Sequence, residues 1–451
     1  MPPASTLPLL AAAVCLPAVS GWAASVLPRA LTPPRAALIA SADVEEPPST
    51  HVQLVAASRS GDWEAAVELL ASLRASGLAK PSELSAAIAA CRRGGQAERA
   101  IEVFNTAKRE GAKLNVGVYN AALAAHRDAG NWQQCDALLT TMRERGVAPD
   151  EVSYMMAISA CRRVGEGKRA AAMVDAMTAA GVAPEERHLA GALDACATQH
   201  ASAEAERMWA LLTASVDQPS EVSYRAALAA RAAAADAAGA LALLAQWRDG
   251  GGAWPCRRLS NAALRACGRA GAIDDALNLL RETVDLNSAD DSSYMSAITA
   301  CARGGEVQKA IELLGECEAR HDPRAAGSAG VDAGKGSAGG AEDGGADGAK
   351  SVAADDAHPS VRVYGAALEA CARGGDWEAA VGLISRMKAR GAPIDFGCYS
   401  AAAHACHAAE EWEALYEVLF EMREVGVVDG ESVRRHHVAM WKEAKRHLGI
   451  S

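Results

Sequence analysis

The sequence predicts an all-α solenoid of about ten helix–turn–helix repeats, each about 35 residues long, on three observations. The 451-residue chain is dominated by alanine, a strong helix former and poor strand former, and is only 4% aromatic. This composition argues against a β fold and against one large core. Cysteines recur at one or two multiples of about 35 residues, a period typical of helical arrays. The residues around these cysteines repeat as well.

The periodic cysteines mark one position of the repeat. They are Cys91, Cys161, Cys196, Cys267, Cys301, Cys371 and Cys406. Their surroundings are similar, as in AIAACRRGG (87–95), AISACRRVG (157–165) and AITACARGG (297–305). The heptapeptide GDWEAAV occurs twice without change, at 61–67 and 375–381. Such internal identity indicates repeated units of one structure.

Each unit contains two helical segments. An apolar stripe at helical spacing leads to the cysteine, and a glycine then breaks the helix. A second helix follows, often with Trp at its start, and ends near another Gly, as expected of a glycine just past a helix C-terminus. The predicted units are 47–80, 81–115, 116–150, 151–185, 186–220, 221–256, 257–290, 291–325, 361–395 and 396–430.

The cysteine column is interpreted as a packing position, because a buried Cys behaves as a small hydrophobe. The sequence contains no CxxC pair, so zinc ribbons and thioredoxin-like motifs are not expected. We expect no metal site and no cofactor. The chain also lacks an apolar run of 18 residues, so no membrane-spanning helix or membrane partner is expected.

The repeat resembles the pentatricopeptide repeat family, with a P-type array. The best match is VGVYNAALAAHRDAGNWQQCDALLTTMRERGVAPD (116–150), with its Val-x-x-Tyr-Asn opening, Ala-Gly turn and Met-x-x-x-Gly-x-x-Pro-Asp ending. Related endings are MTAAGVAPE (177–185) and MKARGAPID (387–395). Tetratricopeptide repeats are the nearest alternative, but their period is 34 residues and their Tyr and Gly positions differ. The resemblance implies a right-handed superhelix.

The resemblance also implies binding of single-stranded RNA, with roughly one base contacted per repeat. In the family, the fifth residue of a unit and its last residue contact one base. The implied base-reading residues are Ser85 with Asn115, Asn120 with Asp150, Asn261 with Asp290, Gly365 with Asp395, and Ser400. The two Asn–Asp pairs are associated with uridine and the Ser–Asn pair with adenosine. Units with Met155, Ala190, Arg225 and Met295 at the fifth position depart from this pattern.

Arginines recur two residues after the cysteine, at the end of the first helix. They are Arg93, Arg163, Arg269, Arg303 and Arg373. A column of five is expected to contact the RNA backbone. The alternative is that each arginine only stabilises a helix C-terminus, where a cation is favoured by about 0.3–1 kcal/mol. The net charge of −11 argues against a generally basic nucleic-acid binder, but not against one basic face.

The remaining segments frame the array. Residues 1–45 are predicted to be a targeting or disordered leader, because 1–42 lack Asp and Glu. Repeats 1–8 are assigned to 47–322 and repeats 9–10 to 361–430. Residues 323–358 are a Gly/Ala/Asp-rich, aperiodic insertion that we expect to be disordered, so units 8 and 9 either stack or form a hinge there. Residues 431–451 are predicted to be a capping helix.

The expected function is that of an organellar RNA-binding protein acting in RNA processing, stabilisation or translation. The leader favours the plastid, with the mitochondrion as the alternative location. Other organellar RNA-processing proteins are possible partners. The chain is expected not to be an enzyme. The nuclease or deaminase domains that some relatives carry after the repeats need a carboxylate cluster or an HxE and CxxC zinc site, and only 21 residues (431–451) follow the last unit. The alternative function is an α-solenoid scaffold that binds a protein partner.

Overall fold

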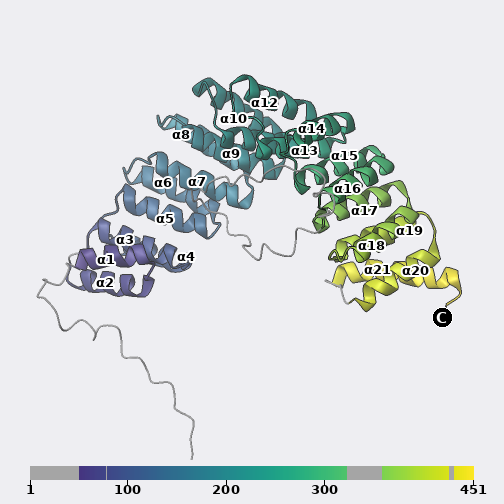
Figure 1. Ribbon diagram of the computed structural model, residues 1–451. Helices are drawn as coiled ribbons and strands as arrows, with labels where there is room; N and C mark the ends of the chain where they lie inside the picture. Colours follow the sequence, from purple (N-terminus) through teal and green to yellow (C-terminus); the bar gives the residue numbers. More distant parts are fainter. Residues whose placement is uncertain (1–49, 78, 322–357, 426–430, 451) are drawn as a thin grey trace, which may run out of the picture. The chain divides into compact units, whose positions relative to one another are not determined.

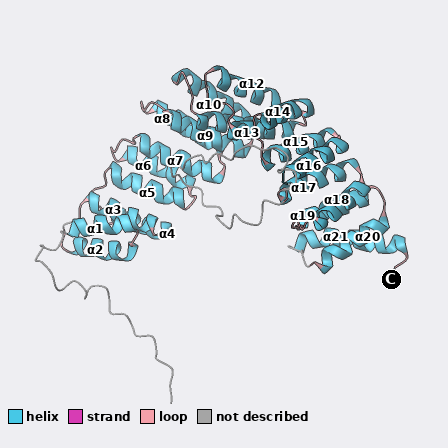
Figure 2. Ribbon diagram, in the orientation of Figure 1, coloured by secondary structure: helices cyan, strands magenta, loops and turns pink. Residues whose placement is uncertain are grey.

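A computed structural model describes residues 50–77, 79–321, 358–425 and 431–450. Within these ranges the chain forms 21 helices and no strand (Figures 1 and 2). The leader at 1–45 lies outside the described residues, as does the insertion at 323–358 except for His358. No helix of the described ranges combines the length and the apolar character needed to cross a membrane.

The first twenty helices form ten hairpins, and the twenty-first follows the last hairpin. Their bounds are α1 Thr50–Ser60, α2 Trp63–Ala75, α3 Pro81–Arg93, α4 Ala97–Arg109, α5 Val116–Asp128, α6 Trp132–Glu144, α7 Glu151–Val164, α8 Gly167–Ala179, α9 Glu186–Gln199, α10 Ser202–Ser215, α11 Glu221–Ala233, α12 Ala237–Asp249, α13 Arg257–Ala270, α14 Ile273–Asp285, α15 Asp291–Gly304, α16 Val307–His321, α17 Val361–Gly374, α18 Trp377–Ala389, α19 Phe396–Ala408, α20 Trp412–Glu424 and α21 Glu431–Leu448. We call the odd-numbered helices α1–α19 the A helices and the even-numbered helices α2–α20 the B helices.

The hairpins stack in sequence order. Each A helix packs against the A helices before and after it, and each B helix packs against the A helix of its own unit and that of the next. The A helix α17 packs against α15 and α16, although the insertion separates them in sequence. This arrangement confirms the predicted all-α solenoid of about ten helix–turn–helix repeats.

The helix ends follow from short-range chemistry. Asp150 precedes α7 and its carboxylate accepts the Ser153 N–H at 2.8 Å, and Asp290 does the same for Ser293 at 3.0 Å before α15. Such side chains satisfy backbone donors that the first turn leaves unpaired. At the other end, Gly165 follows α7 with a φ of 79°, a left-handed conformation that glycine adopts without a steric penalty.

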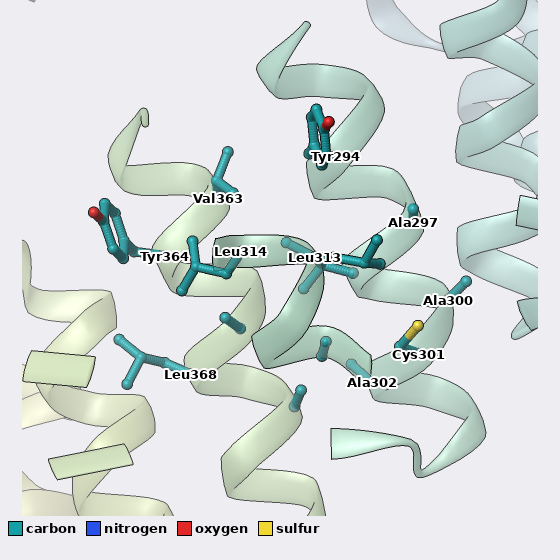
Figure 3. Packing of buried hydrophobic residues seen from close by; sticks show 14 of the residues in the cluster. Tyr294, Ala297, Ala300, Cys301, Ala302, Leu313, Leu314, Val363, Tyr364 and Leu368 are labelled. Atoms are coloured by element: carbon teal, nitrogen blue, oxygen red, sulfur yellow. The ribbon is translucent and has the colours of Figure 1, made fainter. Parts of the chain in front are cut away.

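The interior is built from alanine, leucine and the cysteine column. The third and fourth residues of each A helix from α3 to α19 are buried, and the column cysteines are at most 1% exposed. Figure 3 shows the interface of units 8 and 9, where Val363, Tyr364 and Leu368 of α17 pack near Leu313 and Leu314 of α16. The small alanines and cysteines fill the spaces where neighbouring A helices approach each other.

Burial also makes the column cysteines chemically inert. It raises the pKa of Cys161, Cys196 and Cys267 to about 11. A thiol at neutral pH is then almost entirely protonated, and the reactive form is the thiolate. The column therefore serves packing, as the sequence analysis expected.

Candidate nucleic-acid interface

One face of the A helices is open to solvent. The second residue of each A helix from α3 to α19 is exposed, or half-exposed at Ser292, and the fifth is mostly half-buried. The ninth and thirteenth residues lie on the same side, because these spacings return to one face of an α-helix. We call this surface the A-helix face. It carries exposed apolar side chains at Val152 (41% exposed) and Val222 (54% exposed), the second residues of α7 and α11.

The pair Asn120 and Asp150 comes together on this face. The Asn120 amide Nδ2 donates to the two carboxylate oxygens of Asp150 at 3.1 and 3.3 Å. The Ser153 hydroxyl donates to the Asn120 amide oxygen at 2.5 Å and so fixes which way the amide points. An Asn amide carries two N–H donors, so a donor remains beside the carboxylate oxygens for a ligand. The group can therefore present a donor and an acceptor side by side.

Hydrogen bonds set the charge state of the Asp150 carboxyl group. Burial alone would raise the pKa of Asp150, but the Ser153 N–H, the Asn120 amide and the Ser153 hydroxyl outweigh it and hold the pKa below its usual value. Asp150 is therefore a carboxylate at neutral pH and acts as an acceptor only.

Asn261, Asp290 and Ser293 repeat the same arrangement four units later. The Asn261 Nδ2 lies 3.0 and 3.1 Å from the Asp290 carboxylate oxygens, and the Ser293 hydroxyl donates to Asn261 Oδ1 at 2.6 Å. Two copies with the same atoms and nearly the same distances show that the register of the repeat produces this geometry.

The other predicted pairs are not brought together. Asn115 caps its own helix by accepting the Val118 N–H at 3.1 Å, and the Ser85 hydroxyl donates to the Ser82 carbonyl at 2.9 Å.

In the last two units, Asp395 accepts the Cys398 N–H at 2.9 Å, and Gly365 offers no side chain to it. Ser400 lies 3.2 Å from His437 Nε2 on α21.

The arginine column reaches across the repeat interface. Arg93 donates to the Ser58 carbonyl, Arg303 to the Arg269 carbonyl at 2.7 Å, and Arg269 to the Ala232 carbonyl at 3.5 Å. Each accepting carbonyl lies in the last turn of the preceding A helix, where carbonyls lack helical partners. These three arginines therefore stabilise the neighbouring helix end.

The remaining two members of the column differ. Arg373 pairs with Glu369 of its own helix at 2.7 Å, whereas Arg163 is exposed and forms no ion pair within the described part of the chain. Four arginines of the column therefore have partners within the protein. Arg163 is the member most accessible to a ligand.

A second basic group lies in the middle of the A-helix face. It consists of Arg225, the fifth residue of α11, with Arg265 and Arg269, the ninth and thirteenth of α13. Partial desolvation and the like charges of Arg269 and Arg225 lower the pKa of Arg265. All three are exposed, and none forms an ion pair in the described ranges. We call them the central arginine cluster.

Of the central arginine cluster, the sequence predicted only Arg269, as a member of the arginine column. Arg225, Arg265 and the two serines were not predicted as site residues. Arg225 was treated only as a departure from the base-contacting pattern, although its register places it on the same face as Asn120. Ser153 and Ser293 stand three residues after Asp150 and Asp290, the spacing of a helix capping box, and that spacing was the available signal.

Stacked hairpins of about 35 residues, with polar side chains at one register of the A helices, define a helical repeat protein of the α-solenoid class. The chain belongs to the pentatricopeptide repeat family. Residues 74–249 match the family model described as the pentacotripeptide-repeat region of PRORP, and residues 292–321 and 362–391 match the PPR repeat model. No curated protein matches the sequence.

The chain is similar to solved structures of pentatricopeptide repeat proteins. The pentatricopeptide repeat protein PPR10 in complex with an 18-nucleotide psaJ RNA element has a TM-score of 0.56 and 16% identity, over 89% of this chain and 59% of that chain. PPR10 from maize has a TM-score of 0.46 and 15% identity over 89% of this chain and 62% of that one. The PPR domain of Arabidopsis thaliana protein-only RNase P 1, in complex with tRNA, has a TM-score of 0.35 and 19% identity over 38% of this chain and 91% of that one. The chain thus spans about three fifths of the length of the PPR10 chains it matches.

Proposed function

We propose that this chain binds single-stranded RNA along the A-helix face, in a binding role without catalysis. The observation that carries the proposal is the twofold recurrence of one Asn–Asp–Ser geometry, at Asn120 and at Asn261. A carboxylate acceptor beside an oriented amide can form two hydrogen bonds with the edge of an unpaired base. The exposed Val152, two residues after Asp150, offers an apolar surface against which a base can lie.

The central arginine cluster supports the same ligand. Three cations without acidic partners repel one another, and an anion that bridges them lowers this repulsion. A phosphodiester backbone supplies one negative charge per nucleotide. Arg225 lies between the two Asn–Asp pairs in sequence, and Arg265 and Arg269 lie on α13, the helix that carries Asn261. An RNA strand that contacts both pairs would therefore pass the cluster. PPR10, which shares this fold, is described in complex with RNA, and this agrees with the proposal.

The test compares a double variant on the A-helix face with a matched double variant elsewhere. Asn120→Ala with Asn261→Ala removes both amides. We expect its affinity for single-stranded poly(U) to fall about 30-fold, at about 1 kcal/mol for each lost hydrogen bond, in a fluorescence anisotropy titration. The affinity for poly(A) should change much less.

The control is Asn105→Ala with Asn278→Ala. Both residues are exposed asparagines on B helices, α4 and α14, away from the A-helix face. We expect wild-type binding from this control. Equal affinities of all three proteins for poly(U), or no measurable RNA binding by the wild type, would contradict the proposal and favour a protein-binding scaffold.

We further propose that residues 1–45 direct the protein to the plastid, with the mitochondrion as the alternative. The support is compositional, because this segment is rich in Ala, Ser, Pro and Leu and carries Arg29 and Arg35 but no acid before Asp43. A fluorescent protein fused after residue 45 should enter the organelle. A fusion that stays in the cytosol would contradict the proposal.

A further inference from the structure

Unit 8 contains a cluster of three different metal-binding side chains. Asp291 begins α15, and Cys317 and His321 lie on the last turns of α16. One ligand atom of each lies within 4.8 Å of the ligand atoms of the other two. The Asp291 carboxylate Oδ1 is 2.8 Å from His321 Nε2 and 3.7 Å from Cys317 Sγ. Cys317 and His321 are four residues apart on one helix, so their side chains share a face.

This cluster replaces the ordinary ending of the repeat. In units 3, 4 and 9 the B helix ends with Met-x-x-x-Gly, at Met142–Gly146, Met177–Gly181 and Met387–Gly391. These three glycines adopt positive φ angles and terminate their helices. In unit 8 the same two positions hold Cys317 and His321. Without the glycine, α16 continues to His321, and the helix holds the imidazole over Asp291.

Asp291 has a structural role that other units share, and this role does not explain its two neighbours. Its Oδ2 accepts the Ser360 N–H at 2.7 Å, just as Glu186 Oε1, at the corresponding position of unit 5, accepts the Ser220 N–H at 2.7 Å. In unit 5 the position that corresponds to Cys317 is Leu212, an ordinary core residue. Among the units that the structure describes, unit 8 alone adds a thiol and an imidazole to the carboxylate.

The donor set and its spacing suit zinc. A tetrahedral zinc ion, with bonds of about 2.0–2.3 Å, holds its ligand atoms about 3.3–3.8 Å apart. The Asp291–His321 separation of 2.8 Å is below this range, the Asp291–Cys317 separation of 3.7 Å is within it, and the Cys317–His321 separation is at most 4.8 Å. Small side-chain rotations would bring all three within the range. A thiolate and an imidazole are poor ligands for Mg²⁺ and Ca²⁺, which prefer oxygen, so the set favours a transition-series or zinc ion.

The surroundings leave room for a fourth ligand. Asp291, Cys317 and His321 line one cleft together with His358 and Arg362, which lie just before and within α17. Cys317 is 1% exposed, whereas the other two side chains are partly exposed at 30% and 25%. An ion at the cluster would thus have a buried sulfur on one side and an open coordination position toward the cleft.

We propose that Asp291, Cys317 and His321 form a zinc site that fastens the end of α16 to the start of α15. A water molecule in the cleft completes the coordination. Cys317 binds as a thiolate, and its proton passes to the solvent when the ion enters. The site fixes the chain at the point where the insertion of 36 residues leaves the array. It does not depend on RNA binding.

The test uses the full chain, stripped of metal with a chelator, and Co²⁺ as a spectroscopic substitute for Zn²⁺. We expect one equivalent of Co²⁺ to produce a thiolate-to-cobalt charge-transfer band and the visible bands of a tetrahedral ion. Zn²⁺ should displace it and raise the thermal midpoint of the protein. Cys317→Ser should abolish the charge-transfer band. His321→Gln should weaken Zn²⁺ binding by more than the roughly 10–100-fold that loss of an outer-shell partner costs.

The matched control is Cys135→Ser, which changes another buried B-helix cysteine, on α6, and should keep the band. Circular dichroism in chelator checks that each variant is folded. His321→Gln serves as the second variant if Cys317→Ser does not fold, because His321 is partly exposed. A wild type that binds Co²⁺ without a thiolate band, or no more tightly than a folded His321→Gln protein, would overturn the proposal.

Discussion

At the scale of single residues, buried polar side chains join one repeat to the next. Glu318 of α16 is 2% exposed, accepts the Tyr364 hydroxyl at 2.9 Å and pairs with Arg386 and with Arg390 at 3.5 Å. Burial, together with the adjacent Glu318 charge, raises the pKa of Tyr364. These contacts connect unit 8 to unit 9 across the insertion. One carboxylate therefore satisfies three donors at the junction.

We expect Glu318→Ala to lower the free energy of unfolding by about 2 kcal/mol in urea denaturation. Removing one partner of a fully buried ion pair costs about 3–5 kcal/mol, and the partial exposure of Arg386 and Arg390 reduces that cost. Glu421→Ala is the control, since Glu421 makes the same contact to Tyr399 at 2.8 Å but is 33% exposed. Its loss should stay below about 1 kcal/mol. Equal losses for the two variants would show that burial does not set the strength of the contact.

The proximity of Asn120 to Asp150 followed from register, but not every such pair formed. A helix-capping side chain can serve its own helix or a neighbour, and the sequence does not decide between them. Asp150 caps its own helix at the Ser153 N–H and also accepts from Asn120 of the preceding A helix, whose amide the Ser153 hydroxyl orients. Asn115 has no serine three residues later and hydrogen-bonds only within its own helix. The base-reading roles of these residues stay predictions. The sequence also did not predict the contacts of Arg93 and Arg303 to the preceding helix, because these contacts depend on how adjacent helix ends align.

At the scale of helices, the sequence indicated where units 2–10 begin. The signals were the glycines, the capping residues and the cysteine period. The A helices from α3 to α19 begin at the first residue of their predicted units, because Asp, Asn or Pro near each start favours one helix origin. The extension of α16 to His321 was not predicted. It results from a missing glycine, and the absence of a stop signal is harder to recognise in a sequence than its presence.

We expect Gly268→Ala to destabilise the protein by about 1 kcal/mol or more, although Ala is the better helix former. Gly268 lies within α13, and a Cβ there would stand 2.6 Å from the Ser296 carbonyl oxygen of α15. The two A helices would have to move apart. Gly382→Ala in α18 is the control, because a Cβ there meets nothing within 4 Å, and it should stabilise by up to about 1 kcal/mol. Thermal or urea unfolding measures both, and a stabilised Gly268→Ala protein would contradict the close packing.

At the scale of the whole molecule, the insertion does not interrupt the array. The sequence left open whether units 8 and 9 stack or hinge, since an aperiodic segment carries no information about the contact of its flanking units. The packing of α17 on α15 and α16 resolves this, with Val363 fully buried at the junction (Figure 3). The buried residues form two clusters that meet within α11, where Ala226 belongs to one and Leu228 to the other. Packing thus passes from neighbour to neighbour along the described array.

This nearest-neighbour organisation predicts that a substitution that disrupts one junction unfolds the units on only one side of it. In a solenoid, stability is roughly a sum of unit and interface contributions, so losing one interface releases the shorter end first. We expect Val363→Asp, which places a charge at a fully buried position of α17, to abolish amide hydrogen-exchange protection in units 9 and 10. Protection in α3–α13 should persist. Arg362→Asp introduces the same residue one position earlier, where the side chain is exposed, and should leave the pattern unchanged. If Val363→Asp instead removed protection equally from every unit, the chain would be one cooperative body, and the contacts across the insertion would stabilise the whole array and not only its last two units.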